Sequence, residues 1–188
     1  MQNGAVRRPA SAAALLLSLA AAAGGLAGAD DCPPLFVVER SSNANVVVYE
    51  APRAPGGVVD PKRPVRGHWR MWAEDGRREE LNFVERRLAY GVDVLGPTPG
   101  GGVEIALKAL PERRIEVRRD GPCPAALTAL GGQEALLRRA FVQIASGGLI
   151  PKVAYLELHG EDAATREARV ERIEIDGPRS SAGAPASD

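Results

Sequence analysis

The sequence predicts a mostly β fold, either an antiparallel sandwich or a partly open barrel, with one short α-helix at about 78–89. Three observations support this prediction. Short apolar runs alternate with clusters of Gly, Pro, Asn and Asp throughout the chain after residue 30. Two of these runs, 65–73 and 151–160, alternate residue by residue as strands do. Helical spacing of apolar residues is clear only within 77–89.

The first 29 residues are typical of a secretory signal peptide. Two arginines precede an uncharged apolar run at 10–23, and Ala27-Gly28-Ala29 has the small residues that signal peptidase recognises. The run is shorter than the roughly 20 residues of a membrane-spanning helix, and a Gly-Gly pair interrupts it. We therefore expect cleavage near Ala29 and a periplasmic or secreted protein; an uncleaved membrane anchor is the alternative.

The mature chain should begin with two strands, 35–40 and 45–51, joined by a polar corner at Ser41–Asn45. The stretch 51–64 is a loop by its Pro and Gly content, and 65–73 is the next strand. Within 77–89, the apolar residues fall at i, i+3 and i+7, which predicts the helix; they are Leu81, Val84 and Leu88.

Further strands follow at 103–110, 113–119 and 125–130. The stretch 133–145 is ambiguous, because its residues favour a helix whereas the preceding Gly131-Gly132 suits a tight turn into a returning strand. Strands at 151–160 and 168–175 complete a single domain spanning 30–176. Residues 177–188 have no apolar side chains large enough to form a core, and we expect them to be disordered.

Charge and cysteines narrow the class of protein. The chain has 24 basic and 24 acidic residues, and removing 1–29 takes away two arginines, so the mature net charge is −2. A nucleic-acid binder would need a basic surplus, and no mature segment is long and apolar enough to span a membrane. Cys32 and Cys123 are expected to form a disulfide in an exported protein, with two independent thiols as the alternative.

The sequence offers little for catalysis. Ser146 is not in a nucleophile elbow, and nothing local orients a histidine toward it. Glu157 and His159 share a strand face, and His68 would have to join them to hold a metal ion. A solvated strand end explains Glu157 and His159 as well. We therefore expect no cofactor and no metal, and the alternative function is a metal-assisted hydrolase built on these three residues.

The best ligand-site candidate is one face of the 65–73 strand. It places Arg66, His68, Arg70 and Trp72 together, which suits an anionic group such as a phosphate or a uronic acid. Neighbouring candidates are Asn43, Asn45 and Tyr49. The competing explanation is an ordinary charged outer face on which Trp72 covers arginine side chains by cation–π contact.

Several stretches together resemble a bacterial family of exported domains of unknown function. They are LFVVERSSNANVVVYEA, EELNFVERRLAYGV, LLRRAFVQ and GLIPKVAYLELHGED, in this order over about 35–162. The resemblance implies a small secreted β-rich protein and no established activity. It also implies a β-hairpin over LTALGGQEALLRRAFVQ, so we expect strand rather than helix at 133–145. The two cysteines are not part of this pattern.

These observations predict an exported β domain that is not an enzyme and that binds a ligand or supports an envelope assembly. An anionic envelope ligand or another envelope protein would be its partner. The sequence does not distinguish these partners.

Overall fold

The computed structural model describes residues 32–52, 59–145 and 152–175, so the predicted signal peptide at 1–29 and the predicted tail at 177–188 lie outside it. The strands are β1 (Phe36–Arg40), β2 (Asn43–Glu50), β3 (Arg66–Met71), β4 (Arg77–Glu80), β5 (Val92–Pro97), β6 (Val103–Leu107), β7 (Leu110–Asp120), β8 (Cys123–Leu130), β9 (Gln133–Ala145), β10 (Lys152–Asp162) and β11 (Ala168–Glu174). The helices are α1 (Phe83–Leu88) and a 3-10 turn, η2 (Trp72–Glu74). The mostly β prediction is confirmed.

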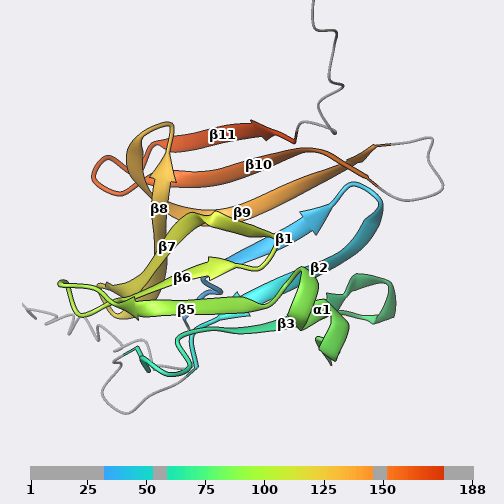
Figure 1. The fold of residues 1–188 in the computed structure, drawn as a ribbon, viewed down its shortest axis with the longest axis horizontal. Helices are drawn as coiled ribbons and strands as arrows, with labels where there is room; N and C mark the ends of the chain where they lie inside the picture. Colours follow the sequence, from blue (N-terminus) through green and yellow to red (C-terminus); the bar gives the residue numbers. More distant parts are fainter. Residues whose placement is uncertain (1–31, 53–58, 146–151, 176–188) are drawn as a thin grey trace, which may run out of the picture.

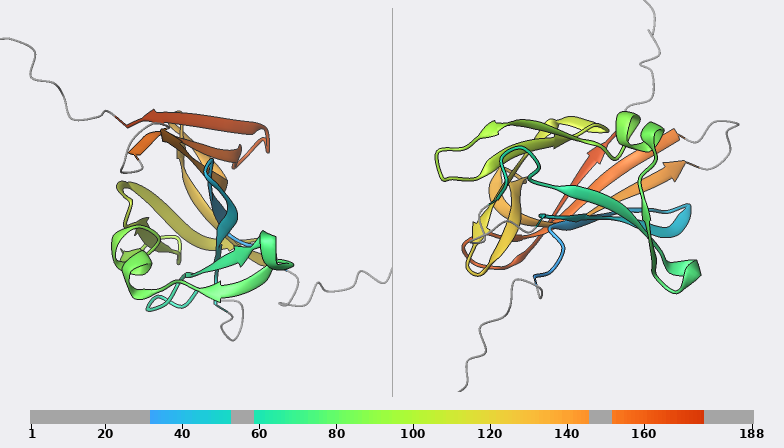
Figure 2. Two further views of the ribbon diagram at one scale, coloured as in Figure 1. Left: turned by 90° about the vertical axis from the view of Figure 1, so that its right-hand side faces the viewer. Right: turned by 90° about the horizontal axis from the view of Figure 1, so that it is seen from below.

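The described strands form one sheet that branches at β9 and curls into a half-barrel (Figures 1 and 2). One arm runs from β9 through β1, β2 and β3 to β4, and the other runs through β8, β7 and β6 to β5. β10 pairs along the opposite edge of β9, and β11 pairs with β10. All of these pairs are antiparallel except β1 with β9, which is parallel. A partly open barrel therefore describes the fold better than a sandwich.

The ambiguous stretch 133–145 is a strand, as the family resemblance implied. Gly131 and Gly132 have φ values of 58° and 81°, and they form the two-residue turn between β8 and β9. This left-handed backbone at both positions is the turn geometry that glycine supports at least cost. The turn sends the chain back along β8, so pairing overrides the helical preference of the residues that follow.

The helix is shorter than predicted. Arg77–Glu80 do not join it but form β4, which pairs with β3. Asn82 then starts α1 with a capping box: its side chain accepts a hydrogen bond from the Glu85 N–H, and Glu85 accepts one from the Asn82 N–H. Sequence spacing gave no indication that a neighbouring strand would pair with the first residues of the predicted helix.

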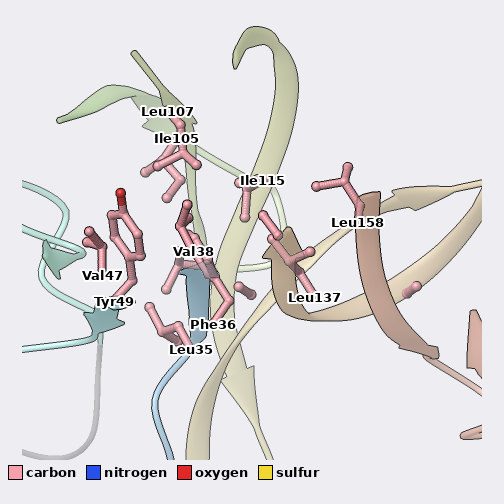
Figure 3. Packing of buried hydrophobic residues seen from close by; sticks show 14 of the residues in the cluster. Leu35, Phe36, Val38, Val47, Tyr49, Ile105, Leu107, Ile115, Leu137 and Leu158 are labelled. Carbon is pink, nitrogen blue, oxygen red and sulfur yellow. The ribbon is translucent and has the colours of Figure 1, made fainter. Parts of the chain in front are cut away.

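The core lies between the inner faces of the two arms (Figure 3). The Phe36 and Tyr49 rings stack at 4.5 Å between β1 and β2, and the Tyr49 hydroxyl donates to the backbone oxygen of Tyr90. The opposite wall is aliphatic, with Ile105 and Ile115 from β6 and β7. The predicted disulfide is present: Cys32 bonds to Cys123 and ties the chain just before β1 to the start of β8.

Candidate ligand-binding site

The predicted ligand face on β3 is neutralised by carboxylates. Pairing places β3 between β2 and β4, with Glu50 opposite Arg66 and Glu80 opposite His68. Arg66 Nη2 lies 2.7 Å from Glu80 Oε1, and Arg78 Nη1 lies 3.2 Å from Glu50 Oε2. We call Glu50, Arg66, Arg78 and Glu80 the outer ion cluster. It leaves little unbalanced positive charge for an anionic ligand.

His68 does not share the exposure of its neighbours. Its side chain lies beneath the outer ion cluster, and the residue is only 5 % exposed. Burial, with a further contribution from the Arg78 charge, lowers its pKa below the ordinary value. A buried, neutral imidazole contributes no charge to a surface site, so His68 adds little to the anion-binding face predicted on 65–73.

Arg70 and Trp72 are exposed and pack against each other. The strand ends at Met71, and Trp72 begins η2 rather than continuing the alternation. The Arg70 guanidinium carbon lies 4.6 Å from the Trp72 ring centroid. This is the cation–π contact of the competing explanation.

The remaining predicted residues lie away from this face. The turn between β1 and β2 is Ser41-Ser42, and Asn43 and Asn45 lie within β2. Asn43 Oδ1 accepts a hydrogen bond from the Asn45 N–H at 2.9 Å, so the Asn43 side chain stabilises its own corner. Tyr49 is fully buried in the inner core and is inaccessible from the outer face.

The three residues of the alternative metal site do not converge. One row of paired residues crosses five strands, from His68 through Val48, Val37 and Arg139 to His159. Four strand spacings place the two histidines roughly 19 Å apart along the sheet, whereas ligands of one zinc ion lie about 2 Å from it. Over the described ranges, no group of three His, Cys, Asp or Glu residues is arranged to hold a metal ion.

The carboxylates near the end of β10 are instead paired with basic side chains and with backbone N–H groups. Glu157 lies 3.3 Å from His159 Nε2 and 3.8 Å from an Arg172 nitrogen. Asp162 accepts hydrogen bonds from the Thr165 and Ala164 N–H groups and from Arg169. These bonds lower the Asp162 pKa to about 2 and fix the turn into β11.

An apolar cavity of about 340 Å³ lies on the inner side of the half-barrel. Aliphatic side chains from both arms and from β10 form its walls, among them Val38, Ile115, Leu137, Ala140, Val142 and Leu156. The segment after α1 closes one side with Ala89 and Tyr90. Val153 and Ile175 also line the cavity and are exposed, so the cavity reaches the surface there. Its size lies within the range of small-molecule sites.

Two arginines line this cavity, and their surroundings differ. Arg113 is paired with Glu171 and also donates to the Ala129 carbonyl oxygen. Arg40 lies 5.1 Å from the Trp69 ring centroid and 5.8 Å from that of Tyr90. No ion pair or hydrogen bond joins the Arg40 side chain to any residue that the structure describes, and its Nε is buried.

Sequence reasoning missed the cavity and Arg40. A signal was present, because Arg40 follows Phe36 and Val38 at every second position of β1 and therefore shares their inner face. The sequence therefore places a cation on the same strand face as two core residues. The sequence alone does not show that no carboxylate lies opposite it.

The helix α1 presents apolar residues to the surface, next to the cavity wall in sequence. Phe83, Val84 and Leu88 are 69 %, 59 % and 68 % exposed. The predicted apolar stripe therefore packs into the core only through Leu81, which precedes the helix.

Comparison with known proteins identifies a family and no characterised relative. Neither the curated proteins nor the solved structures gave a match. A family model described as a domain of unknown function, DUF4833, matches residues 36–172, from the first strand into the last. The match covers most of the chain and every strand of the half-barrel except the last residues of β11, so the chain belongs to the DUF4833 family of domains of unknown function.

Proposed function

We propose that this protein is a non-enzymatic binding module that holds an elongated apolar molecule inside its half-barrel. The apolar cavity supports this proposal most strongly, because its walls come from strands far apart in sequence. Protein interiors are ordinarily packed to crystal density with few voids larger than a water molecule. A cavity of about 340 Å³ that reaches the surface leaves its apolar walls in contact with water unless a ligand covers them, which favours an apolar ligand.

The enzymatic alternative has less support. Two of the three residues of the alternative hydrolase, His68 and His159, lie at opposite ends of a row of paired residues that crosses five strands, and not around one pocket. Among the residues that the structure describes, those lining the cavity are aliphatic or aromatic apart from two arginines, and none is a carboxylate, histidine, serine or cysteine. The ionisable groups among these lining residues besides the arginines are Tyr49 and Tyr90, whose pKa values are raised by burial, so they are poor proton donors and acceptors for general acid–base catalysis at neutral pH.

The cavity proposal is tested with N-phenyl-1-naphthylamine, an uncharged probe that fluoresces in apolar surroundings. Wild-type protein should enhance its fluorescence and saturate. Ala140→Phe and Val142→Phe place a ring in the cavity from β9 and should each reduce probe binding at least about tenfold, because the probe and the ring compete for one volume. Ala168→Phe adds the same ring at an exposed position of β11 and should bind as wild type does.

Two outcomes would contradict the proposal. One is wild-type protein that leaves the probe dark. The other is a folded Val142→Phe variant that binds the probe as tightly as wild type.

We also propose export, on the basis of the signal-like residues 1–29 and the disulfide, since such bonds persist in oxidising compartments. None of the described helices is long and apolar enough to cross a membrane. N-terminal sequencing of the protein from the periplasm of an expressing host should start near Asp30. An intact N-terminus in the cytoplasmic fraction would contradict export.

A further inference from the structure

We infer that the ligand is an amphiphile with a single negative charge on its head group, and that Arg40 binds this head group inside the cavity. The inference rests on the proposed cavity function and adds the chemical class of the ligand. It assigns to Arg40 a binding role that its packing alone does not explain.

The position of Arg40 makes it part of the cavity wall. It is the last residue of β1 and lies on the inner face with Val38, which also lines the cavity. The Trp69 and Tyr90 rings lie within 6 Å of its guanidinium carbon and restrict where the group can point. The rings orient the cation but leave its positive charge without a counter-ion.

Two acids near the cavity arginines are paired with cations other than Arg40. Glu39 precedes Arg40 and lies on the opposite face, 3.5 Å from Arg139 Nη1. Glu171 is paired with Arg113, the other arginine of the cavity wall. The Arg113–Glu171 pair has no net charge, so the described cavity wall has a net charge of +1, located on Arg40.

This charge determines the ligand class. A cation next to an apolar cavity loses hydration, and a hydrogen-bonded anion compensates for that loss. A guanidinium presents planar N–H donors that match a carboxylate or a phosphodiester, and either group has one negative charge. Aliphatic walls around one such cation fit an acyl chain that ends in a monoanionic head.

The test compares ligands that share a chain and differ in the head. Dodecanoate, dodecanol and lysophosphatidylglycerol are each titrated against N-phenyl-1-naphthylamine bound to wild-type protein at pH 8, where a carboxylate is ionised. At least one anion should bind about tenfold or more tighter than dodecanol, because charged hydrogen bonds contribute that much. The anion that binds more tightly identifies the source of the head group.

Substitutions assign the preference to Arg40. Arg40→Met should abolish the preference for the anion and leave dodecanol affinity within about threefold of wild type. The control removes the other cavity cation with its partner, as Arg113→Met combined with Glu171→Gln, and should keep the preference.

If Arg40→Met keeps the preference, or if wild type does not distinguish the anions from dodecanol, the inference is wrong while the cavity function stands. If none of the three ligands displaces the probe, the acyl-chain ligand is wrong. If wild type does not bind the probe at all, the cavity function itself fails.

Thermal unfolding without ligand separates binding from a structural role. Arg40→Met removes an unpaired cation, so its Tm should equal or exceed that of wild type. A large fall in Tm with unchanged ligand selectivity would show that Arg40 braces the Trp69 and Tyr90 rings and does not bind the head group.

Discussion

Arg66 and Arg40 lie on opposite faces of the same arm, and they differ in whether a carboxylate is paired with the guanidinium. Arg66 on β3 has Glu80 at 2.7 Å within the outer ion cluster, and both side chains are about half exposed. Arg40 on β1 faces the cavity, contacts two aromatic rings and has no acidic partner among the described residues. The face with more arginines therefore has the weaker claim to bind an anion.

The comparison shows that arginines on a strand do not by themselves make an anion site. Cross-strand register determines whether each cation is already paired, and here it places Glu50 and Glu80 beside the arginines of β3. Exposed pairs of this kind contribute little to stability. They do, however, remove the positive charge that an anion would otherwise find.

The largest expected effect concerns the element that both regions share. β1 contributes Arg40 to the cavity and pairs with β2, which contributes Glu50 to the outer ion cluster. The disulfide fixes the chain just before β1 across a separation of 91 residues. Cys32→Ser with Cys123→Ser should lower the free energy of unfolding by about 4–5 kcal/mol in the chain-entropy view. Denaturant unfolding monitored by tryptophan fluorescence measures this, and a loss below about 1 kcal/mol would contradict it.

The second prediction concerns a variant in which Arg113, like Arg40, has no acidic partner. Burial opposes ionisation of Glu171, but hydrogen bonds from the Gly131 N–H and from Arg113 lower its pKa, so it is a carboxylate at neutral pH. Glu171→Gln removes this charge and leaves Arg113 as a second unpaired cation in the wall. Affinity for dodecanoate should rise several-fold while affinity for dodecanol stays constant. Calorimetric titration of both ligands checks this, and unchanged selectivity would show that cavity charge does not govern binding.

The third prediction tests the outer ion cluster. Glu50→Gln with Glu80→Gln removes the partners of Arg66 and Arg78. We expect a loss of at most about 1 kcal/mol in the free energy of unfolding, because these pairs are exposed. Binding of dodecanoate in the cavity should stay within twofold of wild type. A tenfold change in dodecanoate affinity would place the anion on the outer face and reverse the comparison.

The smallest predicted effect is the pH response of His68. Because its folded-state pKa lies below 6.5, the unfolded chain binds the proton first as the pH falls. The contribution of His68 to stability is therefore complete above about pH 6.5 and decreases below it, by at most about 1.4 kcal/mol per pH unit. His68→Gln should show a shallower loss of stability than wild type between pH 7 and pH 5. Equal slopes in denaturant unfolding would show that His68 does not titrate differently on folding.

Much of the fold follows from local pattern. Short apolar runs predicted the two strands on either side of the polar corner at Ser41–Asn45, and Gly131-Gly132 suited the turn between β8 and β9. The Arg77–Glu80 strand was missed because its own four residues are all charged and show no alternation of apolar and polar residues. Its strand conformation comes from pairing with β3. Propensity and spacing are local, whereas the edge of a sheet is available only after the chain has folded.

The candidate site could be predicted only in part. Arg66, His68 and Arg70 share one face of β3 whereas Trp72 lies in η2, and the neutralisation of this face depends on Glu50 and Glu80 in the two neighbouring strands. For Arg40 the inner face was readable from Phe36 and Val38. Glu171 lies beside Arg113, 58 residues away in sequence, and not beside Arg40. This placement follows from the way the arms of the sheet curl.

The most direct test of the account follows arginine side chains by NMR during titration with dodecanoate. The Nε–H signals of Arg40, Arg66 and Arg70 report the cavity and the β3 face in one experiment. The account predicts that the Arg40 signal shifts and saturates with the ligand, because its buried Nε gains a charged neighbour, while Arg66 and Arg70 stay in place. Saturating shifts at Arg66 and Arg70 with an unmoved Arg40 signal would contradict it.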